Sequence, residues 1–246
     1  MPKLVVLNDD GTKTIIDSAS FGGGTLSNSN ASFQAFTDCI KTTADSLWAF
    51  TVSGTGAAFT AKANANSNSI GILTLGLGTV ATNRASIDSG NFSILNLGLG
   101  TAFFDSACRF TVLSDATNTY TFRAGFIDSV SAESTDGIFF RYTNGTNSGK
   151  FQAVTRSNGT ETAVDTGITV AISTWYDFEI NINATGTSAA FKINGTVVAT
   201  ITTNIPVGSG RETGYGVYVQ RSVGTASVTP LDCDFVDVRY NFTNAR

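Results

Sequence analysis

The stretches WYDFEININ (Trp175–Asn183) and FKINGTVVA (Phe191–Ala199) decide the fold of this chain. From Tyr176 onward the first stretch alternates apolar and polar residues, which is the pattern of a strand with one buried face and one wet face. The second stretch holds two short apolar runs on either side of Asn194-Gly195. Asn and Gly both tolerate a positive φ, so this dipeptide predicts a tight hairpin turn. Together the two stretches predict a half-buried strand followed by a β hairpin.

The same kind of pattern continues over most of the chain. After Trp48, short apolar runs are separated by Gly, Asn, Ser and Asp at roughly ten-residue intervals, as in sandwiches and barrels of many strands. Only 14% of the residues are charged, against about 25% in an average domain, while there are 25 glycines and 18 phenylalanines. This composition favours strands and tight turns over long helices. We therefore expect residues 47–246 to form one all-β domain of two packed antiparallel sheets.

Two further patterns refine this expectation. In Leu231–Tyr240 the apolar phase shifts at Phe235-Val236, which predicts a last strand with a β-bulge. The octapeptide ILTLGLGT at Ile72–Thr79 is nearly repeated as ILNLGLGT at Ile94–Thr101. A solenoid needs more than two such units, so this pair predicts two neighbouring strands with similar packing.

The first 46 residues have a different character, and we expect them to form an N-terminal arm. A short apolar strand is predicted at Leu4–Leu7, and a second follows before the flexible run Gly22–Gly24. Phe33, Phe36 and Ile40 then recur at three- and four-residue spacing, which fits a short helix, although the many Ser and Thr residues disfavour one. The sandwich is therefore expected to begin at residue 47.

Charge and hydropathy exclude several classes of partner. The net charge is −4 and the isoelectric point is near 4.7, whereas nucleic-acid binding draws on clustered Lys and Arg. No apolar run approaches the roughly 20 residues of a membrane-spanning helix, and the apolar start Met1–Leu7 is too short for a signal-peptide core. We expect neither nucleic acid nor a membrane as a partner, and synthesis in a cytoplasm.

Three cysteines, Cys39, Cys108 and Cys233, lie far apart in the sequence. Their odd number and wide spacing fit neither a disulfide framework nor a paired zinc motif. We expect them to be buried free thiols.

Groups for catalysis are sparse in this sequence. Histidine is absent, which removes the Ser-His-Asp and Cys-His nucleophile systems and the usual zinc and iron sites. A glycosidase needs only a pair of carboxylates, and Asp177 with Glu179 or Asp232 with Asp234 alternate along one strand face. Neither pair extends to the Glu-x-Asp-x-x-Glu motif of the retaining glycosidases built on a sandwich. We therefore expect no enzyme activity and no cofactor.

Two sets of residues are candidates for binding. Calcium takes carboxylate and carbonyl oxygens, and the calcium candidates are Asp232, Asp234 and Asp237, for which a solvated strand face is the alternative. An aromatic ring can stack on the apolar face of a sugar. The glycan candidates are Trp175, Tyr142, Tyr215 and Tyr218, for which core packing is the alternative.

Several motifs carry a resemblance to a known group of proteins. They are Trp175–Ile180, Phe191–Thr200 and Thr203–Pro206, preceded by Gly71–Leu75, Ala81–Ala85, Gly125–Asp128, Asp136–Phe140 and Asp165–Gly167. In this order they resemble the concanavalin A/laminin G-like domains of bacteriophage structural proteins, over residues 48–240. The resemblance implies a two-sheet antiparallel jelly-roll sandwich with a short N-terminal arm. Most of these motifs are turns and core strands, so they carry over no catalytic residue.

The resemblance also implies a place on the virion surface, after synthesis in the host cytoplasm. A compact head on a short arm, without heptads, collagen-like repeats or a shaft, favours a capsid decoration (cement) protein over a long tail fibre. Its partners would be other virion proteins, above all the major capsid protein, and further copies of itself in a homo-oligomer such as a trimer. The candidate docking residues are Leu4, Val5, Val6 and Leu7. The alternatives are a tail or head-fibre adhesin that binds host glycan and, third, a polysaccharide-degrading enzyme.

Overall fold

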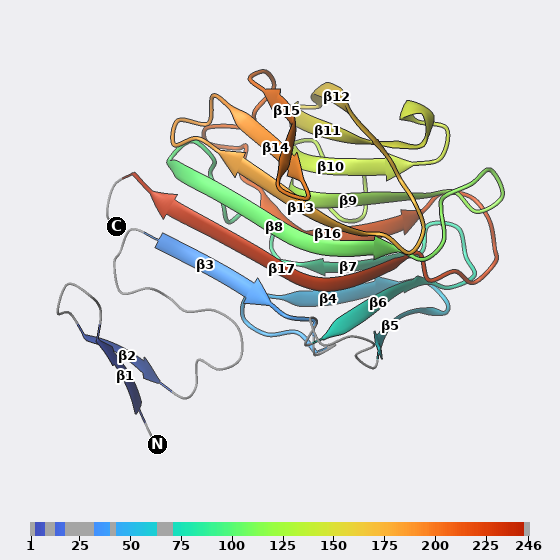
Figure 1. The fold of residues 1–246 in the computed structure, drawn as a ribbon, viewed down its shortest axis with the longest axis horizontal. Coiled ribbons are helices and arrows are strands. Elements are labelled where there is room, and N and C mark those ends of the chain that lie inside the picture. Colours follow the sequence, from blue (N-terminus) through green and yellow to red (C-terminus); the bar gives the residue numbers. More distant parts are fainter. Residues whose placement is uncertain (1–2, 8–12, 18–31, 40–42, 63–70, 244–246) are drawn as a thin grey trace.

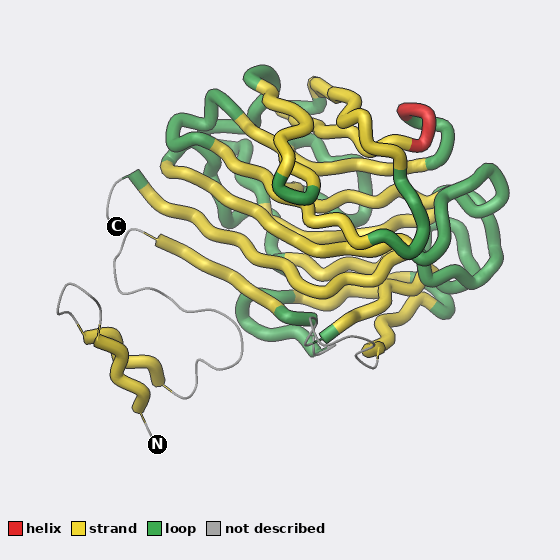
Figure 2. The backbone as a smooth tube through the Cα atoms, in the orientation of Figure 1, coloured by secondary structure: helices red, strands yellow, loops and turns green. Residues whose placement is uncertain are grey.

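The structure is a computed structural model that describes residues 3–7, 13–17, 32–39, 43–62 and 71–243. Over these residues two antiparallel β-sheets pack face to face (Figure 1). The only helical element among them is the short 3₁₀ turn η2 at Asn147–Gly149 (Figure 2). None of the described residues forms a helix with the length and apolar character to cross a membrane. The expected all-β sandwich is therefore confirmed.

Each sheet is assembled from strands that are far apart in the sequence. The strands of the seven-stranded sheet are β4 (Ala49–Ser53), β7 (Arg84–Asp88), β9 (Tyr120–Ile127), β10 (Gly137–Thr143), β11 (Lys150–Ser157), β12 (Thr160–Thr169) and β16 (Gly214–Arg221). They lie in the order β12-β11-β10-β9-β16-β7-β4. The strands of the eight-stranded sheet are β3 (Ser32–Thr37), β5 (Ala57–Lys62), β6 (Ile72–Leu77), β8 (Gly100–Phe110), β13 (Trp175–Ile182), β14 (Ala189–Ile193), β15 (Thr196–Ile201) and β17 (Leu231–Phe242). They lie in the order β15-β14-β13-β8-β17-β6-β5, with β3 also paired to β17.

A separate hairpin is formed near the N-terminus by β1 (Lys3–Leu7) and β2 (Lys13–Asp17). The strand predicted at Leu4–Leu7 is therefore confirmed. The Gly22–Gly24 run and Ile40 lie outside the described residues.

The core lies between the two sheets and is rich in aromatic rings. On β13 every second residue, from Tyr176 to Ile182, is buried. Phe110 of β8 packs edge-on against Phe122 of β9, with ring centroids 5.1 Å apart, and so joins the two sheets. Burying one side chain of this size contributes roughly 1.5–3 kcal/mol. The alternation read from the sequence is thus the alternation between the core and the outer face of the sheet.

Two local predictions are confirmed. β14 and β15 form an antiparallel hairpin, and its turn residues Asn194 and Gly195 have φ angles of 51° and 74°. In β17 the register against β8 shifts between Cys233 and Phe235, which is the bulge predicted from the apolar phase.

The segment expected to hold a short helix is a strand instead. β3 pairs antiparallel with β17, with Phe36 opposite Asp237. Ala35 and Thr37 are buried while Phe36 is 42% exposed, so the side chains alternate at every second residue. Backbone hydrogen bonds to the edge of β17 outweigh the weak helical preference of a Ser- and Thr-rich segment. The sandwich consequently includes residues 32–37, which the sequence had placed in the arm.

The two near-identical octapeptides do not form a pair of strands. The first copy contributes β6, which lies between β5 and β17. The second copy runs as a loop from Ile94 to Leu99, with one bridge between Leu95 and Thr213, and β8 begins only at Gly100. The first copy has a strand to pair with on each side, whereas the second lies at the end of the sandwich. Similar local sequences therefore take different conformations because their neighbours differ.

The three cysteines are buried free thiols, as predicted. Although far apart in the sequence, Cys108 and Cys233 lie directly opposite each other on β8 and β17. Burial raises the pKa of the Cys108 thiol well above its usual value. Because the thiolate is the reactive form, this burial makes Cys108 a poor nucleophile.

Candidate functional site

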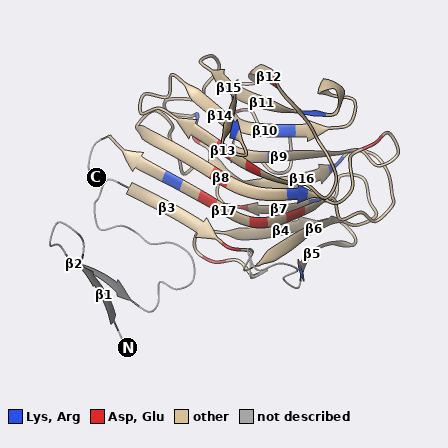
Figure 3. Cartoon of the chain, viewed as in Figure 1, with Lys and Arg blue, Asp and Glu red and all other residues tan. Residues whose placement is uncertain are grey.

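Acidic side chains gather on the outer face of the eight-stranded sheet. Outward positions on β13, β8 and β17 place Glu179 opposite Asp105, and Asp105 opposite Asp237. We call these three residues the carboxylate row; Asp177 lies on the same face of β13 as Glu179. Figure 3 shows acidic and basic positions side by side along β17 and its neighbours. Opposed positions in a sheet have Cβ atoms about 5 Å apart, so like charges there repel.

The two outer members of the row have basic partners. Lys192 Nζ lies 2.5 Å from Glu179 Oε1, and the Asn181 amide donates a hydrogen bond to the same oxygen. Arg239 lies 2.6 Å from Asp237 Oδ2. These charge-assisted contacts hold both outer carboxyl groups in fixed positions on the face.

Asp105, at the centre of the row, has different surroundings. Burial, a hydrogen bond with Asp177 and the negative charges of Asp177, Glu179 and Asp237 raise the pKa of its carboxyl group to about 8. Its Oδ1 atom is buried and has no hydrogen-bond partner in the described part of the chain. Asp105 is therefore a neutral carboxylic acid at pH 7. A neutral acid can donate a hydrogen bond, or a proton, to an oxygen atom of a ligand.

Aromatic rings flank the carboxylate row on the same face. The guanidinium of Arg109 lies over the Trp175 ring, with its carbon 4.8 Å from the ring centroid. The guanidinium of Arg239 lies over the Phe103 ring in the same way, at 4.5 Å. Phe36 on β3 is 42% exposed and adds a third ring. A guanidinium therefore covers one face of the Trp175 ring and one face of the Phe103 ring and places hydrogen-bond donors there, and the remaining apolar surface of each ring is what a ligand can contact.

A hollow of about 480 Å³ opens next to the row, and we call it the face hollow. Its lining includes Thr101, Phe103, Asn181, Asn183, Ser188, Ala190, Arg239 and Asn241. Asn181 and Arg239 connect the hollow to the row, because they contact Glu179 and Asp237. The lining combines amides, hydroxyls and one guanidinium with an aromatic ring, and its size falls within the about 300–1,000 Å³ of small-molecule sites.

Of the four glycan candidates predicted from the sequence, only Trp175 lies on this face. Tyr142, Tyr215 and Tyr218 are buried, with 3%, 1% and 0% of their surface exposed. The Tyr215 hydroxyl donates to the carbonyl of Leu47 at 2.9 Å. These three rings have no face open to a sugar. They belong to the core, which was the alternative to sugar binding.

The three calcium candidates do not come together as a metal site. Asp232 is fully buried and lies 2.7 Å from Lys62 and 2.6 Å from Arg109. Burial opposes ionisation of Asp232, yet the hydrogen bonds that it accepts hold its pKa below the usual value. Asp237 belongs to the carboxylate row, and Asp234 lies at the bulge of β17. Among the described residues, no three Asp, Glu, His or Cys side chains lie close enough to hold a metal ion.

The sequence identified the pair Asp177 and Glu179 but missed Asp105. Asp105 comes from β8, and the register of β8 against β13 cannot be read from a local pattern. A signal was nevertheless present in the alternating stretch TAFFDSACRF (Thr101–Phe110), where Asp105 falls on the wet phase.

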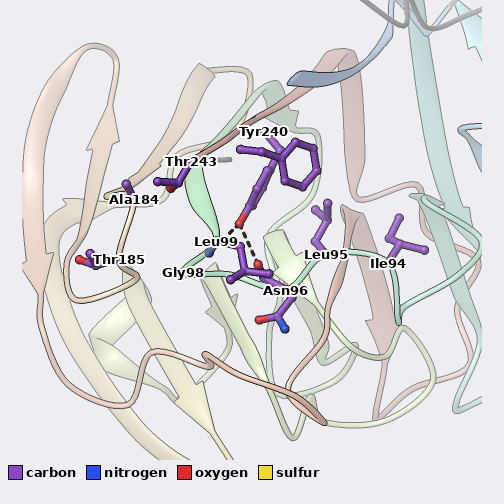
Figure 4. Close-up of a pocket in the computed structure, with 10 residues that line it drawn as sticks. Ile94, Leu95, Asn96, Gly98, Leu99, Ala184, Thr185, Tyr240 and Thr243 are labelled. Atoms are coloured by element: carbon purple, nitrogen blue, oxygen red, sulfur yellow. Dashed lines mark hydrogen bonds between the residues drawn. The ribbon is translucent and has the colours of Figure 1, made fainter. Parts of the chain in front are cut away.

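A second hollow, of about 580 Å³, lies at the end of the sandwich (Figure 4). Ile94, Leu95 and Leu99 line it from the loop before β8, and Tyr240 lines it from β17. The Tyr240 hydroxyl donates to the carbonyl of Asn96 at 2.7 Å and accepts from the amide of Leu99 at 3.1 Å, which ties the loop to β17. No charged side chain is among the described residues that line this hollow. Its chemistry is therefore unlike that of the face hollow.

Comparison with known families identifies the group to which the sandwich is related. Residues 68–234 match the family model described as the SO2946-like C-terminal domain. The chain belongs to the SO2946-like family. No curated protein sequence matches it.

The solved proteins that are similar in structure to the SO2946-like chain include the three that follow. SO2946 from Shewanella oneidensis MR-1, a protein of unknown function, aligns with a TM-score of 0.66 and 12% identity over 90% of this chain and 92% of that one. An endo-1,3-β-glucanase from Streptomyces sioyaensis aligns at 0.56 and 13%, covering 86% and 97% of the two chains. Peanut lectin aligns at 0.54 and 9%, covering 87% and 99%. At these identities the likeness shows the fold alone, and it confirms the concanavalin A-like jelly roll.

Proposed function

We propose that the SO2946-like chain binds carbohydrate on the outer face of its eight-stranded sheet, with the glycan lying over the face hollow and the carboxylate row. The observation that carries this proposal is the neutral carboxyl group of Asp105, set among fixed carboxylates, amides and guanidinium groups beside partly exposed aromatic rings. A sugar presents hydroxyls that both donate and accept, together with an apolar ring face. The face offers a partner for each of these features.

The charge balance of the face favours an uncharged glycan. Glu179 and Asp237 are paired with Lys192 and Arg239, and Asp105 is neutral at pH 7. A strongly anionic polysaccharide would meet carboxylates, and a cationic one would displace the existing ion pairs. The names of two proteins with the same fold, a glucanase and a lectin, support the carbohydrate class without specifying a sugar.

Calorimetric titration of the full chain with neutral β-linked oligosaccharides, for example laminarihexaose and cellohexaose, tests the proposal. Phe103→Ala removes an aromatic contact at the edge of the face hollow, and we expect it to weaken binding about fivefold, since stacking on one ring is worth about 1 kcal/mol. Thr160→Ala, at an exposed position of β12 in the other sheet, is the matched control. Binding by wild type that Phe103→Ala leaves unchanged would place the glycan elsewhere, and no binding to any neutral or charged glycan would reject the proposal.

One observation favours a second candidate, a glycoside hydrolase. Asp105 is a neutral acid hydrogen-bonded to Asp177 and directly opposite Glu179. Retaining glycosidases use an acid and a nucleophile whose carboxyl groups are about 5–5.5 Å apart, a spacing that neighbouring outward positions of a sheet can provide. Asp105 would protonate the glycosidic oxygen as its bond to the anomeric carbon breaks and the Glu179 carboxylate bonds to that carbon. A water molecule deprotonated by Asp105 would then release the sugar from Glu179. Release of reducing ends that Asp105→Asn abolishes, with oligosaccharide binding retained, would establish this activity.

The virion setting, with the chain as a capsid decoration protein or as an adhesin, is a further proposal, and its support comes from the sequence resemblance alone. A glycan-binding head would suit either position on a particle. Quantitative gels and electron microscopy of purified particles would decide, because decoration requires many copies over the head and adhesion requires a few at the tail. Absence of the chain from particles would reject both.

A further inference from the structure

The end of the sandwich carries an apolar surface that the proposed function does not use. The hollow of Figure 4 adjoins another of about 350 Å³, and both are lined by Ile94 and Leu95. We call the two together the end trough. Phe33 of β3 lines one part and Phe242 of β17 the other. We propose that the end trough is the docking site for the N-terminal hairpin β1–β2 of the same chain.

The exposure and chemistry of the trough point to an apolar occupant. Ile94 is 40% exposed and Leu99 is 57% exposed, and both belong to the loop that replaces the expected strand. Neither hollow has a charged residue among the described residues that line it. Covering an apolar surface with apolar side chains is favourable because it removes both from water. Such a surface provides few hydrogen-bonding or charged groups for a sugar or an anion.

The hairpin itself needs a surface to pack on. Two strands alone are marginally stable in water, and within the described residues β1 pairs only with β2. By register and two-residue alternation, positions Leu4, Val6 and Ile16 share one face with Thr14, a set without charge. The other face carries Val5, Leu7 and Ile15 together with the charged residues Lys3, Lys13 and Asp17 at its ends. The uncharged face is the one we assign to the trough.

The connection between hairpin and trough is short enough to favour docking within one chain. Ser32, the first residue of β3, pairs with Asn241, and the neighbours of Asn241 on β17 both line the trough. In Figure 1 the beginning of β3 and the end of β17 lie at the same end of the sandwich. The 14 residues from 18 to 31 can span roughly 50 Å when extended. A tether of this length gives a local concentration in the millimolar range, so the chain's own hairpin outcompetes that of a second copy at micromolar protein.

Hydrogen exchange of the full chain tests the docking. Val6→Asp places a charge on the uncharged face of the hairpin, and Leu99→Asp places one in the trough. We expect each to speed exchange in both Lys3–Leu7 and Ile94–Leu99 at least about tenfold, because each side loses its cover. Val5→Asp, on the charged face of the hairpin, and Val223→Asp, at a 48% exposed position outside the trough, are the matched controls and should leave both segments unchanged.

Other occupants give different results. An exchange rate in Lys3–Leu7 that Leu99→Asp leaves unchanged would overturn the proposal. A second copy as the occupant would make the protection of Lys3–Leu7 from exchange increase with protein concentration. It would also give a dimer in light scattering that Val6→Asp dissociates, and these two results together would overturn docking within one chain. A chain lacking residues 2–24 should bind the apolar dye ANS more strongly than the full chain, and equal binding would show that the trough is open in both. Leu99 is largely exposed, so a charge there should not prevent folding.

Discussion

The substitution Asp105→Asn should stabilise this protein, and the gain should be absent below pH 4, grow as the pH rises, and be largest above pH 8. The folded chain holds the Asp105 carboxyl at a pKa of about 8, mainly because burial disfavours the charged form, against 3.8 for the free group. Below pH 4 the group is protonated in both folded and unfolded chains, so it has no effect on stability. Between pH 4 and pH 8 the Asp105 carboxyl is ionised in the unfolded chain but still protonated in the folded chain. The free energy of unfolding therefore falls as the pH rises, until the carboxyl also ionises in the folded chain.

The size of the effect follows from the two pKa values. Each unit of difference corresponds to about 1.4 kcal/mol, so the largest possible penalty is roughly 6 kcal/mol. Asp105 is only partly buried, and solvent screening reduces that figure, so we expect Asp105→Asn to add about 2 kcal/mol to the free energy of unfolding above pH 8. In a domain of this size that gain raises the melting temperature by about 4–8 °C.

Urea unfolding of wild type and Asp105→Asn at pH 4, 6 and 8.5 measures this directly. The two curves should coincide at pH 4 and separate at pH 8.5. Asp177→Asn is the companion variant: it removes the neighbouring charge that raises the pKa of folded Asp105, so the loss of stability should still begin near pH 4 but end at a lower pH and be smaller than in wild type. A variant no more stable than wild type at pH 8.5 would refute the assignment of Asp105 as a neutral acid, and so would a carboxyl carbon signal that titrates near pH 4 in NMR.

Four further outcomes are expected. Affinity for a neutral oligosaccharide should fall as the pH rises through 8, because Asp105 then loses the proton that it donates; calorimetry showing constant affinity from pH 6 to 9 would contradict this. Asp232→Ala should cost about 3 kcal/mol at pH 7 in urea unfolding, since it leaves basic groups around a buried position without their carboxylate, and the cost should shrink as the pH falls below 4. Gly195→Val should cost about 1 kcal/mol or more, because a β-branched residue strains a φ of 74°, whereas Thr196→Val beside it should be nearly neutral. Phe104→Ala should cost about 3–5 kcal/mol by opening a cavity in the core, and a loss below 1 kcal/mol would contradict the packing described.

Much of the fold could be predicted because its signals are local. The strand at Trp175–Ile182, the Asn194-Gly195 turn and the bulge near Phe235 each depend on a few adjacent residues. Two-residue alternation and tolerance of positive φ are properties of the chain itself, so they survive into the folded protein.

The failures of prediction share a different cause. Phe33 and Phe36 have helical spacing, but the edge of β17 draws their segment into the sheet. Ile94–Leu99 has nearly the sequence of β6, but at its place in the fold it has no strand on each side to pair with. In both cases a long-range backbone partner, or its absence, overrides the local pattern.

The candidate site was visible in the sequence only in part. Trp175, Asp177 and Glu179 lie on one strand, and their common face follows from their spacing. The burial of Tyr215 and Tyr218 could not be predicted from the sequence, because aromatic residues occur both in core strands and on exposed sheet faces.

The sequence by itself determined an all-β chain of many short strands, with its turns, its bulge and its buried thiols, because each of these follows from adjacent residues. Only the tertiary structure brought Asp105 between Glu179 and Asp237, three carboxyl groups from three strands. Their meeting depends on strand order and register, which are set by the packing of the whole core. Burial and the proximity of these carboxyl groups raise the pKa of Asp105 to about 8, so the outer face carries a neutral acid.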